Sequence, residues 1–269
     1  MTFLSKIKTL IEYAKYGMNY TKMLRIETTH LEIPDKVNYL YKDSCPPYIT
    51  SIYAKNVERL DNNFFEASYI EKVDFPSLTY VSHSCFRGSN ISEINIPLAK
   101  TIGTRSFENT MALYSIELPE AKQINDYAFI QSYIETINAP KVEKIYLFAL
   151  QECCNLMTAY LPSVTDLGSG VFSNDFMLTS LTLGALTDTS GDTFEYCYSL
   201  TDLTVGKGTT ASLHLVDTDL TQESLHSIID NYADMTGKEA PTFNVGEYKL
   251  SKIDPVYLEK LERKNINYQ

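Results

Sequence analysis

The chain has 269 residues, of which 44% are hydrophobic, and its formal net charge is -11 at pH 7. This length allows one or two folded domains, and the acidic balance argues against nucleic acid and anionic membrane surfaces as partners, since both need clustered Lys and Arg. No stretch approaches the roughly 18 consecutive apolar residues of a transmembrane helix, so no membrane insertion is expected.

Residues 1–27 precede the regular part of the sequence, and we expect a helix over residues 3–17. One stripe of this helix is apolar and consists of Leu4, Ile7, Leu10, Ile11 and Ala14. Lys6 and Lys8 interrupt the apolar region that a secretory signal needs, so we expect a signal that was removed or synthesis in a cytoplasm. The segment is predicted to cap the domain that follows, with docking into a larger assembly or a homo-oligomer as alternatives.

Residues 28–212 repeat one pattern about nine times, at a spacing of 21 or 22 residues. One aliphatic column contains Ile52, Val73, Ile94, Ile116, Ile137, Ala159, Leu181 and Leu203. Thirteen residues further along each copy, a second column contains Phe65, Phe86, Phe107, Phe129, Leu150, Phe172 and Phe194. A fixed period of this length is typical of a solenoid, whose stacked copies bury one continuous core.

Each copy begins with a short predicted strand, as in Leu113-Tyr-Ser-Ile116-Glu-Leu118-Pro119. Apolar and polar residues alternate along it, which indicates one buried face, and the proline ends the strand. A turn with further inward aliphatic residues leads to the Phe column. A weaker first copy is predicted at Leu31-Glu-Ile33-Pro34. At about 4.8 Å per copy, the copies would form a rod roughly 40 Å long.

Residues 213–269 break the pattern and are predicted to form a C-terminal α/β cap. We expect a helix with Thr221 as its N-cap and Gly237 as its stop, then a strand over residues 242–245. Asp254 and Pro255 open a final helix by the N-cap and first-turn proline rule. A short strand over residues 266–268 ends the chain.

The repeat resembles the BspA-type, or treponemal, leucine-rich repeat. The similarity rests on Ile102-Gly103-Thr-Arg-Ser-Phe107, Leu167-Gly168-Ser-Gly-Val-Phe172 and Phe194-Glu-Tyr-Cys197. It implies a leucine-rich repeat solenoid with 21–22-residue repeats of a strand plus a turn or short helix. The segment from Leu220 to Thr242 is similar to the C-terminal cap of such proteins from bacteriophages and gut Firmicutes. This resemblance implies an adhesive or virion-surface role and brings no catalytic residues.

Other chemistry has weak support in the sequence. The histidines His30, His83, His214 and His226 form no pair at ligand spacing, so no metal site is predicted. Cys153 and Cys197 share one column two copies apart, beyond disulfide reach, and are expected to be free thiols. No converging acid–base set exists on either cap. We therefore expect no catalytic residue, no cofactor and no enzyme activity, and an enzyme with its chemistry on a cap is the least favoured interpretation.

The outward column of the strands is the candidate binding face. Its polar and aromatic side chains suit contacts with a sugar or a polar protein surface, although any solvated strand face also carries polar residues. The candidate residues are Tyr53, Lys72, Asp74, Glu93, Asn95, Glu117, Asn138 and Tyr160. The favoured function is that of a bacteriophage virion component, such as a fibre, neck or tail decoration. It would bind a host surface protein or glycan, or neighbouring virion proteins. The alternative is a bacterial cell-surface adhesin.

Overall fold

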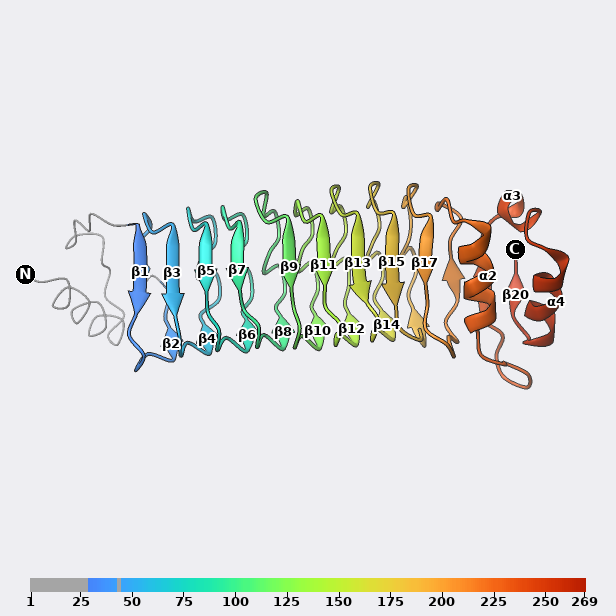
Figure 1. Ribbon diagram of the computed structural model, residues 1–269, viewed down its shortest axis with the longest axis horizontal. Helices are drawn as coiled ribbons and strands as arrows, with labels where there is room; N and C mark the ends of the chain where they lie inside the picture. Colours follow the sequence, from blue (N-terminus) through green and yellow to red (C-terminus); the bar gives the residue numbers. More distant parts are fainter. Residues whose placement is uncertain (1–28, 43–44) are drawn as a thin grey trace, which may run out of the picture.

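The computed structural model describes residues 29–42 and 45–269. The chain winds into a parallel β-solenoid, with its coils stacked side by side and its C-terminal cap at one end (Figure 1). This arrangement confirms the predicted solenoid. The predicted helix over residues 3–17, and with it the N-terminal cap of residues 1–27, lies outside the described residues.

One face of the solenoid consists of the strands predicted from the repeat. These strands are β1 (His30–Ile33), β3 (Ser51–Ala54), β5 (Lys72–Asp74), β7 (Glu93–Asn95), β9 (Ser115–Glu117), β11 (Thr136–Asn138), β13 (Thr158–Leu161), β15 (Ser180–Leu183) and β17 (Asp202–Thr204). They pair in parallel and in register, so that Leu31 lies opposite Ile52 and Ile137 opposite Ile116. The strand of the weak first copy is thereby confirmed. Because side chains alternate along a strand, the residues that flank the buried column point to solvent.

A second sheet runs along the opposite edge of the core. It contains β2 (Tyr39–Leu40), β4 (Arg59–Leu60), β6 (Tyr80–Val81), β8 (Thr101–Ile102), β10 (Gln123–Ile124), β12 (Lys144–Ile145), β14 (Asp166–Leu167) and β16 (Asp188–Thr189). The sequence indicates only a turn with one aliphatic residue here. Two-residue strands are too short to show an alternation of buried and exposed side chains. Only their pairing with neighbouring strands along the rod identifies them. Between β1 and β17, the residues that the structure describes join the two sheets by turns, without helices.

The phenylalanine column forms a stack inside the solenoid. The ring centroids of Phe86 and Phe107 are 5.2 Å apart, and those of Phe107 and Phe129 are 5.0 Å apart. Leu150 interrupts the stack. It resumes with Phe172 and Phe194, whose ring centroids are 6.1 Å apart. A continuous core of this kind lets each coil bury its apolar residues against its neighbours.

The strand face divides between β7 and β9. Strands β1–β7 form a four-stranded sheet and β9–β17 form a five-stranded sheet, whereas the opposite sheet is continuous over its eight strands. Phe107 is six residues before Leu113, while Phe86 is five before Ile91. This extra residue precedes β9. Ile94 in β7 is only half-buried, although its equivalents in the column are buried.

The C-terminal cap consists of β18 (Leu213–His214), α2 (Gln222–Asn231), β19 (Thr242–Asn244), α3 (Glu247–Leu250), α4 (Pro255–Arg263) and β20 (Asn267–Tyr268). Thr221 caps α2 by accepting a hydrogen bond from the Ser224 amide, and Asp254 caps α4, both as predicted. The predicted stop of α2 at Gly237 is wrong. The helix ends at Asn231 because Tyr232 adopts an extended backbone and forms a β-bridge with Thr209.

Candidate binding face

We define the strand face as the outward side chains of the odd-numbered strands from β1 to β17. This face carries all eight predicted residues. Tyr53 lies in β3, Lys72 and Asp74 in β5, Glu93 and Asn95 in β7, Glu117 in β9, Asn138 in β11 and Tyr160 in β13. They flank the buried column on both sides, as strand alternation requires. The structure therefore brings the predicted residues onto one surface.

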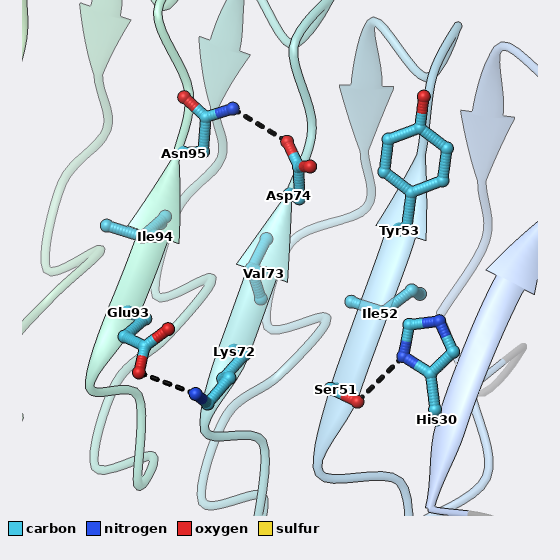
Figure 2. Close-up of a pocket in the computed structure, with 10 residues that line it drawn as sticks. All are labelled: His30, Ser51, Ile52, Tyr53, Lys72, Val73, Asp74, Glu93, Ile94 and Asn95. Carbon is cyan, nitrogen blue, oxygen red and sulfur yellow. Dashed lines mark hydrogen bonds and ion pairs between the residues drawn. The ribbon is translucent and has the colours of Figure 1, made fainter.

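A shallow hollow of about 620 Å³ lies over strands β1–β7 (Figure 2). The Lys72 ammonium lies 2.6 Å from a Glu93 carboxylate oxygen. The Asn95 amide donates a 2.7 Å hydrogen bond to Asp74. The side chains of Lys72, Asp74, Glu93 and Asn95 therefore pair with each other across neighbouring coils, and this half of the face combines both signs of charge.

A second hollow, of about 350 Å³, lies over strands β9–β15. Its polar lining is dominated by hydroxyls and consists of Glu117, Thr136, Asn138, Thr158, Tyr160, Ser180 and Thr182. The Asn138 amide donates a 2.6 Å hydrogen bond to Glu117. Within the described part of the chain, the hydroxyls of Thr136, Thr158 and Thr182 have no side-chain hydrogen bond. These hydroxyls are available to an external ligand.

Sequence reasoning did not include His30, Ser51 and Ser180 among the candidate residues. His30 Nδ1 lies 2.8 Å from the Ser51 hydroxyl, and both line the first hollow, while Ser180 lines the second. Each residue precedes a buried member of the aliphatic column by one position. That column was therefore the signal that could have found them.

The ionisable groups with the largest changes in pKa lie away from the strand face. Burial raises the pKa of the Cys85 thiol to about 12, which keeps it protonated at neutral pH. All five cysteines are free. Among the residues that the structure describes, no group of three or more His, Cys, Asp or Glu side chains is arranged to hold a metal ion. The same residues include no helix that is long and apolar enough to cross a membrane.

The strand face therefore offers hydrogen bonds and contact area over many coils. The sequence matches the model of the BspA type leucine rich repeat region over residues 1–110 and 100–213, with six copies. The chain belongs to this family. This match confirms the resemblance seen in the repeat and in its phenylalanine column.

Solved structures with a similar fold include three bacterial proteins. A leucine-rich cell surface protein from Faecalibacterium prausnitzii is 16% identical, with 86% of this chain and 75% of that chain covered and a TM-score of 0.38. A leucine-rich repeat protein from Bacteroides ovatus is 17% identical over 70% and 73% of the two chains, with a TM-score of 0.35. The pneumococcal vaccine antigen PcpA is 16% identical over 89% and 78%, with a TM-score of 0.32.

At these identities the structural likenesses carry no argument about function. No curated protein matches the chain. The family match agrees with a leucine-rich repeat surface protein, and the comparisons give no support to the predicted virion component.

Proposed function

We propose that this BspA-type protein is a non-enzymatic adhesin of a bacterial cell surface and that it contacts its ligand through the strand face. The family match supports a surface protein. The observation that carries the proposal is the strand face itself, where outward polar side chains repeat in register over β1–β7 and again over β9–β17 and line two hollows. A binding role needs a large surface of this kind and no reaction centre.

The proposed ligand is a host surface protein or glycan. Shallow hollows lined by hydroxyl, amide and carboxylate groups suit ligands that offer many hydrogen bonds over an extended contact. Tyr53 and Tyr160 add aromatic area at the two hollows, with little loss of side-chain entropy on binding. Surface ion pairs such as Lys72–Glu93 contribute about 0–1 kcal/mol, so a ligand can replace them at low cost.

The test of the strand face is a triple variant, Asp74→Ala, Asn95→Ala and Glu117→Ala. We expect it to reduce binding of the purified chain to a glycan array and to cultured animal cells by about tenfold or more. The matched control is Lys122→Ala, Glu143→Ala and Asp166→Ala, which removes exposed polar side chains along the opposite sheet. Equal binding by both variants, with the fold intact by circular dichroism, would move the ligand site off the strand face.

The proposed location has a separate test. Antibodies against the solenoid should label intact bacterial cells that carry the gene, as seen by electron microscopy. Labelling of purified phage particles in place of cells would overturn the cell-surface location and restore the virion interpretation.

A further inference from the structure

A row of exposed side chains, most of them aromatic or methionine, follows the turns that precede the strands. The row lies four residues after the phenylalanine column and contains Tyr69, Asn90, Met111, Tyr133, Cys154, Phe176 and Tyr198. In Figure 1 these turns form the line of loops above the strands, and the loops rise higher over β9, β13, β15 and β17. The raised loops are those with one extra residue before the next buried leucine.

The apolar part of this row is concentrated over β9–β17. Together with the nearby Met157 and Met177, this apolar part of the row forms what we call the aromatic–methionine ridge, defined as Met111, Tyr133, Met157, Phe176, Met177 and Tyr198. Each of these side chains is between 38% and 55% exposed. Single exposed apolar residues are normal on a protein surface, but their recurrence near the same turn of five consecutive coils indicates an interaction site.

The charges around the ridge are all of one sign. The ridge and strands β9–β17 come from residues 109–118, 130–139, 151–160, 173–182 and 195–204, which contain no Lys, Arg or His. Their solvent-accessible charges are the carboxylates of Glu117, Glu135, Glu152, Glu195 and Asp202. Within the described part of the chain, none of these five carboxylates forms an ion pair. The half over β1–β7 differs, because it carries Lys72 and Arg87 in ion pairs.

The ring geometry argues against a sugar as the occupant of the ridge. Phe176 and Tyr198 stack on each other with centroids 6.3 Å apart and an interplanar angle of 17°. Stacking therefore covers one face of each ring, whereas a sugar ring packs on an exposed aromatic face. A second copy of the chain is also disfavoured, since two ridges in contact would bring like charges together.

We infer that the aromatic–methionine ridge docks a cationic amphipathic protein segment, with Lys or Arg residues beside apolar anchors. Its apolar side chains would pack on Met157, Phe176 and Met177, and methionine adapts well to varied partners. Its basic groups would lie beside Glu135, Glu152 and Glu195, whose carboxylates form no ion pair within the described residues and favour positive charge. This surface is separate from the strand-face ligand site and does not depend on it.

The test measures fluorescence anisotropy of a labelled synthetic helical peptide of leucine and lysine with the whole protein. We expect binding that weakens as salt is added. The triple variant Met157→Ser, Phe176→Ser and Tyr198→Ser should weaken it by about tenfold or more. The control variant Leu98→Ser, Tyr248→Ser and Val256→Ser removes apolar side chains elsewhere that are at least as exposed, and it should bind as the unaltered chain does.

Two comparison peptides separate charge from apolar contact. A leucine and glutamate peptide should not bind, and a lysine and serine peptide should bind more weakly than the leucine and lysine peptide. Equal binding of all three peptides, or equal binding by the ridge and control variants, would overturn the inference. If sedimentation shows that the unaltered chain is a dimer and the ridge variant a monomer, the inference is also overturned and the ridge is assigned to a second copy. The strand-face proposal is read from binding to the glycan array and to cells, and the ridge from peptide binding, so failure of one does not decide the other.

Discussion

The rings of Phe107 and Phe129 lie parallel, with an interplanar angle of 3° and centroids 5.0 Å apart, although 22 residues separate them in the sequence. This relationship repeats along the rod and fixes the register of one coil on the next. The same register places the strand-face residues in rows, and it places the aromatic–methionine ridge at the turns. The surfaces proposed to bind therefore depend on a buried column that a ligand never touches.

We expect Phe107→Ala to destabilise the protein by about 3–5 kcal/mol, because a fully buried ring is lost between two stacked neighbours and a cavity is left. Phe107→Leu should cost clearly less, since Leu150 occupies the same column and is fully buried. Urea denaturation followed by circular dichroism measures both. Equal losses in the free energy of unfolding for Phe107→Ala and Phe107→Leu would mean that packing within this column does not stabilise the protein.

Neighbouring coils offer a matched test of backbone strain at the turns. Ala67 has a φ of 52° and Gly88, its equivalent one coil later, has a φ of 60°. Left-handed backbone costs roughly 1 kcal/mol for a residue with a Cβ atom, and Ala67 is exposed. We expect Ala67→Gly to stabilise the chain slightly and Gly88→Ala to destabilise it by up to about 1 kcal/mol. Opposite signs in thermal denaturation would contradict this assignment.

The division of the strand face predicts a local difference in amide exchange. The Phe75 and Leu118 amides donate to the carbonyls of Asn95 and Asn138 on the next coil. The equivalent Ile96 amide has no such bond to Glu117 within the described residues. We expect Ile96 to exchange its amide hydrogen faster than Phe75 and Leu118. An amide without a hydrogen bond to the next strand can exchange without the local unfolding that a bonded amide requires. Similar protection of all three in hydrogen-exchange NMR would show that the ladder is continuous.

The sequence predicts the solenoid well because its signals are local and repeated. Ile116 and Leu118 alternate with polar neighbours, Pro119 ends the strand, and Phe129 recurs at a fixed distance. Repetition turns weak local preferences into a reliable register. The second sheet could not be predicted in this way, since a two-residue strand such as Tyr80–Val81 has no periodicity of its own.

The candidate site was less accessible to sequence reasoning. The column that contains Asp74 and Asn95 was visible, but their mutual hydrogen bond depends on the register of adjacent coils. The ridge was missed because Met157 and Phe176 are residue types that normally indicate core. The end of α2 was also missed, because pairing of Tyr232 with Thr209 overrides the glycine signal at Gly237.

The cap has its own test at Lys264. Its ammonium donates to the carbonyls of Ile229, Asp230 and Tyr232, at 3.1, 2.8 and 2.6 Å, and so satisfies the C-terminal end of α2. We expect Lys264→Met to destabilise the cap by about 1–2 kcal/mol, because these carbonyls lose a charged donor. Lys238→Met is the control, since the exposed Lys238 ammonium makes no hydrogen bond in the described part of the chain. Equal melting temperatures for both variants would contradict the capping role.

The buried carboxyl of Asp175 should make the stability of the protein depend on pH. Asp175 occupies the column of small residues that includes Ser132 and Cys153, and its Oδ1 accepts a 2.8 Å hydrogen bond from the Cys153 amide. Burial raises the pKa of Asp175 well above its usual range, and its Oδ2 has no partner. The folded protein therefore binds a proton at this carboxyl more tightly than the unfolded chain does.

The sign of the effect on stability follows from this difference. At a pH below the unfolded pKa of about 4, Asp175 is protonated in both states and carries no penalty. As the pH rises toward the raised folded pKa, the unfolded state releases its proton first, so the free energy of unfolding falls. Asp175→Asn keeps the size and the hydrogen-bond acceptor but cannot ionise. We expect this variant to gain stability over the unaltered chain as the pH rises from 4 to 7, measured by urea denaturation at both values. A constant difference in the free energy of unfolding would mean that Asp175 keeps an ordinary pKa. A difference that shrinks or changes sign as the pH rises would mean that the folded state favours the ionised form of Asp175.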